Sequence, residues 1–234
     1  MTDTDPATLK RAAATRALDF VTDGMKLGLG TGSTAEAFLD VLAPRIRGGL
    51  TIVGTATSER TAVKARALGI PLADLDQQAP LDLTIDGADE ADRELNLIKG
   101  GGGALLREKI VAASSKKMVV IADESKLVRK LGKFPLPVEV TQFGHLATAA
   151  RLAQAAKKFK GRMVPMTLRM NGEVPFVTDG GNVIYDCAFG AIDDAPKLAR
   201  ILSAIPGIVE HGLFVKLASA LVIAGAKGVK VIEA

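Results

Sequence analysis

The chain has 234 residues, of which 48% are hydrophobic and 24% are charged, and this balance is typical of a folded globular protein rather than a disordered one. Its 30 Lys and Arg residues against 26 Asp and Glu residues give a formal net charge of +4, and the basic residues are scattered. With one Tyr and no Trp the chain has no aromatic platform for stacking bases, so its composition argues against nucleic acid and suits a small anionic ligand.

Helix and strand patterns alternate over the first half of the chain. We predict helices over residues 7–21, 34–44, 58–69 and 104–115, and strands over residues 25–30, 50–56, 81–86 and 116–123. Pro44 is expected to end the second helix, while Ser58 caps the third helix and Gly69 ends it. Strands that alternate with helices predict parallel βαβ units, and therefore a layered α/β sheet.

The pattern changes after Lys133. The proline-rich segment 134–140 indicates a domain boundary or an edge strand. A helix over 146–159, strands over 162–170, 175–179 and 182–186, and a helix over 195–205 then follow. This order resembles a ferredoxin-like unit. We therefore predict a smaller α+β domain over residues 134–207, inserted into a parallel-sheet domain made of residues 1–133 and 208–234.

The single cysteine and the apolar segments bear on the compartment. Cys187 excludes an internal disulfide, and we interpret it as a packing residue. The N-terminal stretch lacks the apolar core of a signal peptide. The longest apolar run, residues 217–226, is far shorter than the ~20 residues that a membrane-spanning helix needs. These features predict a soluble, cytoplasmic protein.

The first stretch of chemical interest is GLGTGSTA, where a predicted strand ends and a helix begins. In an open parallel sheet, ligands bind outside the carboxyl ends of the strands. Gly30 and Gly32 would let the backbone approach a ligand closely, and Thr31, Ser33 and Thr34 supply hydroxyls beside the free amides of the helix start. Ser33 stands where a dinucleotide fingerprint needs glycine. The stretch favours a phosphate site; a plain glycine turn with Ser/Thr capping is the alternative.

Three further stretches follow predicted strands. In DGADEAD, the carboxylates of Asp86, Asp89 and Glu90 suit sugar hydroxyls, proton transfer or Mg²⁺, although the spacing of a calcium loop is missing; a solvated acidic turn is the alternative. In KGGGGALLREK, Lys99 precedes four glycines, and Glu108 is either a functional group or a surface residue of a charge run. In DESK, Lys126 reaches a phosphate or is merely solvated. Together the four stretches favour a small phosphorylated polyol or sugar as the ligand.

In their order and spacing, GLGTGSTA, DGADE, KGGGGALLREKI and DESK resemble the ribose-5-phosphate isomerase family of the A type, as does AIPGIVEHGLF further on. The resemblance implies a Rossmann-like parallel-sheet domain with a smaller α+β domain, assembled as a homodimer or homotetramer. It also implies an aldose–ketose isomerase that interconverts D-ribose 5-phosphate and D-ribulose 5-phosphate through a cis-enediolate. Such an enzyme needs no metal or other cofactor and belongs to the non-oxidative branch of the pentose phosphate pathway.

The resemblance also implies roles for residues. Glu108 would be the base that moves a proton between C2 and C1, assisted by Asp86, Asp89 and Lys99. The residues that would contact the substrate are Thr31, Gly32, Ser33, Thr34, Asp86, Gly87, Ala88, Asp89, Lys99, Gly100, Gly101, Gly102, Lys126 and Lys10. Of these, Lys99 and the glycines would stabilise the enediolate oxygens, and Lys126 and Lys10 would bind the phosphate end. We expect burial or neighbouring carboxylates to raise the pKa of Glu108.

Two other functions are weighed against the isomerase. An amino-sugar-phosphate deaminase of the same superfamily would need a ring-opening histidine, whereas His145 and His211 lie outside the four motifs. A sugar-phosphate-sensing domain of a repressor would need a helix-turn-helix segment, typically before a first strand that begins here near residue 26. A module that only binds its ligand also gives no reason for Glu108.

Overall fold

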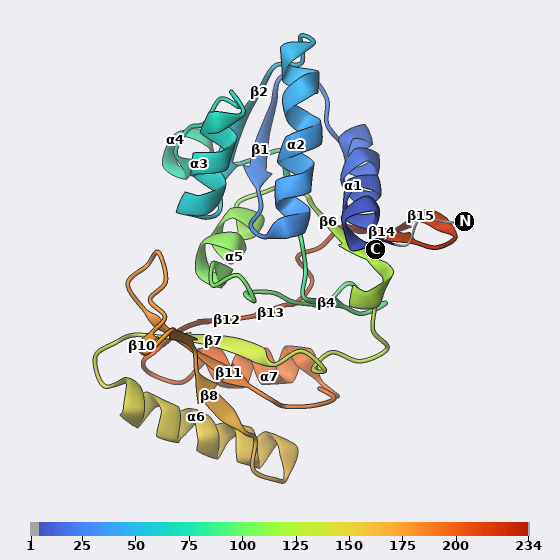
Figure 1. The fold of residues 1–234 in the computed structure, drawn as a ribbon. Coiled ribbons are helices and arrows are strands. Elements are labelled where there is room, and N and C mark those ends of the chain that lie inside the picture. The colour runs from blue at the N-terminus through green and yellow to red at the C-terminus, as the bar shows by residue number, and fades with distance from the viewer. Residues whose placement is uncertain (1–4, 234) are drawn as a thin grey trace. The chain divides into compact units, whose positions relative to one another are not determined.

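The computed structural model describes residues 5–233 and divides into two units (Figure 1). Of the described residues, the first unit comprises 5–88, Arg107–Leu127 and 216–233, and the second comprises Asp89–Leu106 and Val128–Val215. Each unit has its own apolar core. Within residues 5–233, no helix is both long enough and apolar enough to cross a membrane.

The first unit is built on a six-stranded sheet in the order β15-β14-β6-β3-β1-β2. Its strands are β1 (Met25–Leu29), β2 (Ile52–Ala56), β3 (Leu83–Asp86), β6 (Met118–Asp123), β14 (Ala220–Gly225) and β15 (Gly228–Glu233). Neighbouring strands are parallel except for β15, which pairs antiparallel with β14. The predicted parallel α/β sheet is therefore confirmed. The strand order reverses direction between β1 and β3, and this switch point is where such sheets bind ligands.

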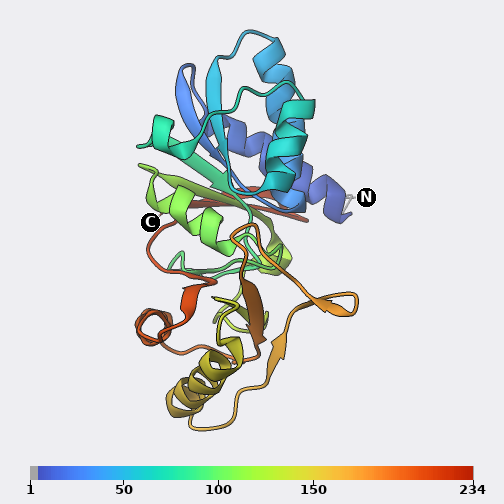
Figure 2. The same cartoon turned by 90° about the vertical axis from the view of Figure 1, so that its left-hand side faces the viewer.

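Helices cover both faces of this sheet. They are α1 (Pro6–Ala17), α2 (Ser33–Arg47), α3 (Glu59–Ala67), α4 (Leu75–Gln78) and α5 (Leu105–Ala113), with short 3-10 turns η1 (Leu18–Phe20) and η2 (Glu124–Lys126). Ala13 of α1 and Phe38 of α2 share an apolar core with Leu27 of β1 on one face. The helix α5 covers the other face (Figure 2). A Cβ added to Gly28 of β1 would lie 2.6 Å from Cγ1 of Val111 on α5.

The predicted ends of α3 are confirmed, and the predicted end of α2 is wrong. Ser58 caps α3 by accepting a hydrogen bond from the Thr61 amide at 3.1 Å, and Gly69 follows the helix with φ +74°, as predicted. The predicted end of α2 at Pro44 is wrong, because the helix continues to Arg47. Proline removes one N–H donor but keeps its carbonyl, and here the Pro44 carbonyl accepts from the Gly48 amide at 3.0 Å. The last turn of α2 therefore keeps a backbone hydrogen bond although it contains Pro44.

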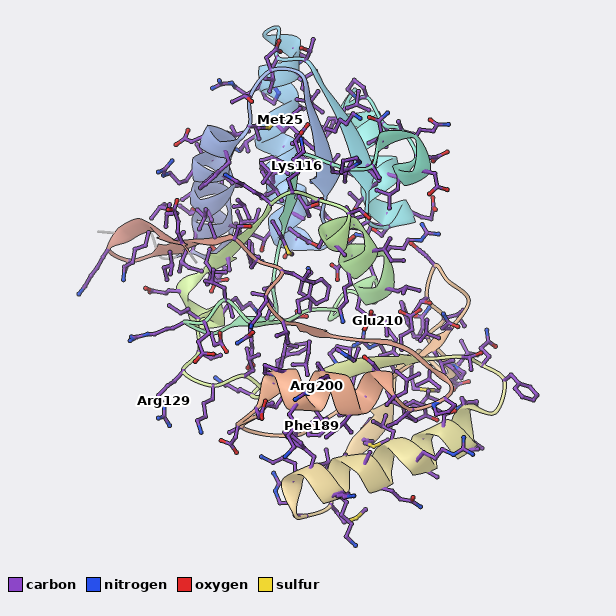
Figure 3. The ribbon with its side chains drawn as sticks, turned by 180° about the vertical axis from the view of Figure 1, so that it is seen from behind. Met25, Lys116, Arg129, Phe189, Arg200 and Glu210 are labelled. Carbon is purple, nitrogen blue, oxygen red and sulfur yellow. The ribbon has the colours of Figure 1, made fainter. Side chains whose placement is uncertain are left out.

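The second unit contains an antiparallel sheet in the order β12-β7-β11-β8. Its elements are β7 (Leu136–Val140), α6 (His145–Lys160), β8 (Met166–Leu168), β11 (Val183–Cys187), α7 (Ala195–Ser203) and β12 (Ile208–His211). This path and strand order confirm the ferredoxin-like prediction. Phe189 lies between α6 and α7 and meets Phe159 edge to face at 6.3 Å (Figure 3).

Shorter strands complete the second unit. A hairpin of β9 (Met170–Asn171) and β10 (Val174–Pro175) lies between β8 and β11 in the chain. A three-stranded sheet joins β4 (Glu90–Ala91), β5 (Leu97–Ile98) and β13 (Leu213–Phe214) in the order β13-β5-β4. Lys99 and the four glycines directly follow β5.

The proline-rich segment forms β7, which lies between β12 and β11, so the prediction of an edge strand is wrong. The Pro137 carbonyl accepts a hydrogen bond from the Gly212 amide at 2.8 Å. The return bond of the ladder would need the N–H that Pro137 lacks. The Gly212 carbonyl accepts from the Lys99 amide at 2.9 Å instead, so proline leaves no buried acceptor without a donor.

Cys187 ends β11, is 0% exposed and belongs to the core of the second unit, which confirms that it is a packing residue. Burial, and to a smaller extent the charge of Asp186, raises the pKa of its thiol to about 12. At about pH 8 only about 1 thiol in 10⁴ is then the reactive thiolate.

We expect iodoacetamide to leave Cys187 unmodified in the native protein and to alkylate it in guanidinium chloride, as read by mass spectrometry. Native alkylation at the rate of a free cysteine would contradict this.

Candidate active site

The loop after β1 and the end of β3 meet at the switch point of the first sheet. The Gly30 amide donates to the Ile85 carbonyl at 2.9 Å, and the Thr31 amide donates to Oδ1 of Asp86 at 3.0 Å. A Cβ on Gly30 would lie 2.1 Å from that same Oδ1, so only glycine fits beside this carboxylate. Two stretches predicted separately, GTGST and DGAD, are thus in direct contact.

The carboxylate of Asp86 is completely buried, with 0% of the residue exposed. Its Oδ1 accepts hydrogen bonds from the amides of Thr31, at 3.0 Å, and of Gly87, at 2.7 Å. A Cβ on Gly87 would lie 3.7 Å from Cβ of Thr34, so Gly87 also borders the start of α2. Ala88 is half-buried and is the last residue of this part of the first unit. The backbone of both motifs therefore fixes the orientation of Asp86.

The hydroxyl of Thr31 forms hydrogen bonds within a cluster of buried hydroxyls. Its Oγ1 lies 2.7 Å from Oγ1 of Thr57 and 2.8 Å from Oγ of Ser58, and Thr61 Oγ1 donates to the Gly30 carbonyl at 3.0 Å. These partners stand at the end of β2 and the start of α3. Thr31 therefore shapes the loop with its side chain. Sequence reasoning assigned Ser58 only a helix cap and missed Thr57 and Thr61.

A cation and a hydroxyl stand together at the start of α2. Nζ of Lys10, from α1, donates to Oγ of Ser33 at 2.9 Å. Gly32 precedes α2 with φ +99° and makes no side-chain cap bond, so the first amides of a 15-residue helix are not capped by a side chain. An ammonium group, a hydroxyl and a helix N-terminus together suit a phosphate group. Lys126, in η2 at the end of β6, is half-buried.

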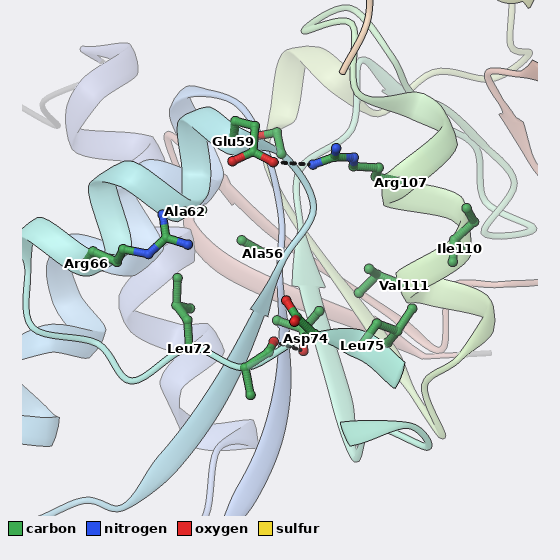
Figure 4. A pocket seen from close by; sticks show the side chains of 13 residues that line it. Ala56, Glu59, Ala62, Arg66, Leu72, Asp74, Leu75, Arg107, Ile110 and Val111 are labelled. Carbon is green, nitrogen blue, oxygen red and sulfur yellow. Dashed lines mark hydrogen bonds and ion pairs between the residues drawn. The ribbon is translucent and has the colours of Figure 1, made fainter. Parts of the chain in front are cut away.

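Two consecutive residues of α5 have opposite surroundings. Glu108 is 4% exposed, so the alternative that it is a surface residue of a charge run is wrong. Arg107 instead pairs with Glu59 of α3, with Nη1 and Oε1 2.8 Å apart and both side chains substantially exposed (Figure 4). The hydrogen bond and the charge of Arg107 lower the pKa of Glu59. Successive helical residues point about 100° apart, which allows this division.

The four glycines form a tight turn of the second unit rather than a linker. Gly100 and Gly103 have φ of +101° and +81°, which favour glycine, and the Gly103 amide donates to the Gly100 carbonyl at 3.0 Å. Lys99, before the turn, is 2% exposed, and its Nζ lies 5.5 Å from the centre of the Phe214 ring. Gly101 and Gly102 are exposed at the tip of the turn.

The acidic residues of DGADE bond to different segments of the chain. Asp89 Oδ2 accepts from the Gly101 amide at 2.7 Å, and a Cβ on Gly101 would lie 2.5 Å from Asp89 Oδ1. Glu90, which is 3% exposed, accepts from the amides of Gly132 at 2.6 Å and Phe134 at 2.7 Å and thereby holds that loop. Within residues 5–233, no group of three or more His, Cys, Asp or Glu side chains has an arrangement that could hold a metal ion.

The two histidines both lie in the second unit, outside the four motifs that follow predicted strands. His145 Nδ1 lies 2.8 Å from the Tyr185 hydroxyl, and His211 Nε2 lies 3.2 Å from the Ser203 hydroxyl. His211 is 4% exposed. These contacts tie each ring to a neighbouring strand or helix, and they give the deaminase alternative no support.

Comparison with known proteins identifies the family. The sequence pattern of ribose 5-phosphate isomerase A (phosphoriboisomerase A) matches residues 53–228. Ribose-5-phosphate isomerase A of Nitrobacter hamburgensis is 57% identical over 226 residues, which cover 96% of this chain and 97% of that protein. Its counterpart in Rhodopseudomonas palustris is 58% identical over 226 residues, with the same coverage.

Solved structures agree with the sequence comparison. Ribose 5-phosphate isomerase A of Methanocaldococcus jannaschii superposes with a TM-score of 0.89 at 40% identity, covering 97% of this chain and 99% of that one. A D-ribose-5-phosphate isomerase in complex with phospho-erythronic acid superposes with a TM-score of 0.92 at 39% identity, covering 98% and 100%. The family match spans most of the chain, and the relatives match it almost end to end. The resemblance seen in the motifs is therefore confirmed, and the chain belongs to the ribose 5-phosphate isomerase A family.

Proposed function

We propose that this protein interconverts D-ribose 5-phosphate and D-ribulose 5-phosphate through a cis-enediolate, without a metal. The observation that carries the proposal is the contact of the GTGST loop with Asp86, which joins a candidate phosphate site to a fixed carboxylate at the switch point. The family membership supports it. The relative that binds phospho-erythronic acid supports it as well, since a carboxylate presents two oxygens side by side, as a cis-enediolate does.

The phosphate end of the substrate would bind at the start of α2. Lys10 and Ser33 already share a hydrogen bond there, and the helix start offers amide donors that favour an anion. Gly32, Thr34 and Lys126 are further candidates for this end, and Thr31 holds the loop in shape. Asp86, Gly87, Ala88 and Asp89 are the candidates for the hydroxyls and the reacting oxygens.

The chemistry would begin with Glu108. Its carboxylate takes the proton from C2, the C1 carbonyl oxygen gains negative charge, and a cis-enediolate forms. The hydroxyl proton on O2 then passes to O1, and Glu108 returns its proton to C1, so a ketose forms with no change in overall composition. Lys99 and the turn of Gly100, Gly101 and Gly102 would stabilise the charged oxygens, because donors fixed in advance act most strongly where charge develops. The Gly101 amide itself is bonded to Asp89, so the open amide of Gly102 is the candidate donor.

The remaining predictions concern the setting of the enzyme. We infer a homodimer or homotetramer, a cytoplasmic location, a place in the pentose phosphate pathway, and no nucleic acid or membrane partner. The family resemblance and the composition support these inferences.

The reaction itself provides the first test. We expect the protein to convert ribose 5-phosphate into ketose, followed by ultraviolet absorbance, at the same rate with and without excess EDTA. Absence of turnover in fresh, folded protein would exclude the isomerase function. Loss of turnover with EDTA, restored by one added divalent metal, would exclude only the metal-free mechanism.

The role of Glu108 is tested by Glu108→Gln. A positioned base contributes roughly 10²–10⁴-fold, so we expect kcat to fall by about that factor while KM for ribose 5-phosphate changes little. Glu173→Gln is the matched control, because Glu173 is exposed in the turn between β9 and β10. A variant with near-normal kcat would assign the base to another residue.

The Gly30–Asp86 contact is tested by Gly30→Ala. The added methyl group would meet Asp86 Oδ1 at 2.1 Å and displace the carboxylate. We expect kcat/KM to fall by about 10²-fold or more and stability to fall by roughly 1–3 kcal/mol. Gly48→Ala is the control, since Gly48 has φ −84° and an added Cβ there would meet no atom closer than 3.4 Å. Equal effects of the two substitutions would show that the contact has no special role.

A further inference from the structure

Arg169, the residue after β8 in the second unit, joins its sheet to the glycine turn. Its Nη1 donates to the carbonyls of Gly100, at 2.9 Å, and Gly101, at 3.2 Å. Its Nε and Nη2 donate to the two carboxylate oxygens of Asp186, on β11, at 2.9 and 2.5 Å. The Arg169 side chain is only 15% exposed and that of Asp186 is 26% exposed. The bidentate pair with Asp186 therefore fixes the plane of the guanidinium group whose Nη1 bonds the turn.

The peptide between Gly100 and Gly101 is held at both of its poles. Its carbonyl accepts from Arg169, and its N–H donates to Oδ2 of Asp89 at 2.7 Å. A trans peptide is planar, with the carbonyl and the N–H pointing in opposite directions. Bonds at the two ends therefore prevent this peptide from rotating about the chain, and the exposed tip of the turn begins from a fixed point.

The next peptide is oriented in the same way. The Gly101 carbonyl points to Arg169, so the N–H of Gly102 points to the opposite side. Gly102 is exposed, and no residue within 5–233 accepts a hydrogen bond from its amide. A backbone amide that is both oriented and open is a suitable donor to a negatively charged ligand oxygen.

Phe176 supports the other end of the turn. A Cβ on Gly103 would lie 2.4 Å from Cζ of Phe176, so the ring occupies the space that a side chain would need. The Arg169 guanidinium carbon lies 6.0 Å from the centre of the same ring, and the Phe176 amide donates to the Arg169 carbonyl at 2.9 Å. Arg169 and Phe176 thus form one support, with hydrogen bonds at Gly100 and Gly101 and van der Waals contact at Gly103.

We propose that Arg169, aligned by Asp186, is a positioning residue that holds the glycine turn so that the Gly102 amide faces the enediolate oxygen. The proposal rests on the proposed function. Arg169 acts through the turn and does not itself touch the substrate. A lysine cannot replace it, because an ammonium group lacks the planar fork that serves a carboxylate and two carbonyls at once.

Kinetics of Arg169→Met and Arg169→Lys provide the central test. A displaced oxyanion donor costs about 10²–10³-fold when it is lost completely, so we expect a misaligned turn to lower kcat by roughly 10–100-fold in both variants. KM for ribose 5-phosphate should change less than about 3-fold, while Kd for phospho-erythronic acid should rise by nearly the factor lost in kcat. Arg151→Met is the control, because Arg151 is exposed on α6.

A second measurement separates positioning from general stability. In Arg169→Met we expect the Gly101 amide to exchange with solvent faster by NMR, while the amides of β11 and β7 keep their protection. Asp186→Asn should lower kcat on its own but add little in the Arg169→Met background, because Asp186 acts through Arg169. If Arg169→Met does not fold, Arg169→Lys and Asp186→Asn are measured at a temperature below their Tm.

The possible outcomes separate the isomerase function from the positioning role of Arg169. A wild-type protein without isomerase activity would remove the proposed function, and the exchange of Gly101 and the affinity for phospho-erythronic acid would still decide whether Arg169 orders the turn. An active wild type, with Arg169→Met and Arg169→Lys equal to it in kcat and in Kd, would overturn the positioning role and leave the isomerase function intact. Uniform loss of protection across the second unit would make Arg169 a general structural residue, and that also overturns the proposal.

Discussion

The buried carboxylate of Asp86 fixes the end of β1 against the end of β3, and the candidate phosphate site of the first unit depends on this contact. The strands pair in register up to Leu29 and Ile85, and the chain beyond them is held by hydrogen bonds to Asp86 Oδ1. A side chain at Gly30 would break the arrangement, since its Cβ would lie 2.1 Å from that oxygen. The loop then has one path, and this path sets where α2 begins and therefore where Ser33 meets Lys10.

The second unit repeats the device with different residues. Asp89 accepts a hydrogen bond from the Gly101 amide, and a Cβ on Gly101 would lie 2.5 Å from its other oxygen. In both places a carboxylate is placed against a glycine whose missing side chain makes room for it. Glycine-rich segments lose much conformational entropy when they become ordered, so they need such partners. The turn of Gly100–Gly103 has a further partner in Arg169, which donates to the Gly100 and Gly101 carbonyls, groups that the carboxylate of Asp89 cannot bond because it only accepts.

The features that local sequence determines were predicted well. Alternating elements gave the parallel sheet, and Ser58 and Gly69 placed the ends of α3, because caps and left-handed glycines act within one helical turn. Among the wrong predictions are those for β7, for the end of α2 and for a strand over 175–179, where only β10 (Val174–Pro175) forms. Whether Pro137 is tolerated inside a sheet depends on a bond between Gly212 and Lys99, and residues so far apart in the chain leave no local signal. Arg169 was missed for the same reason, since its partners lie 17, 68 and 69 positions away in sequence.

The charge run Arg107-Glu108-Lys109 shows where pattern reasoning ends. In sequence the run resembles a solvated helix face, yet Glu108 is 4% exposed while Arg107 reaches out to Glu59. Burying an ionisable group costs several kcal/mol unless its surroundings compensate, so a fold selected for stability alone would place an apolar residue there. Lys99, in the second unit, is 2% exposed, and its burial carries the same kind of cost. Two buried charged residues inside one glycine-rich motif are costly for folding and useful for moving protons and stabilising oxyanions. The burial of Glu108 and Lys99, which only the tertiary structure reveals, is thus a chemical reason, independent of the family resemblance, to place function in this motif.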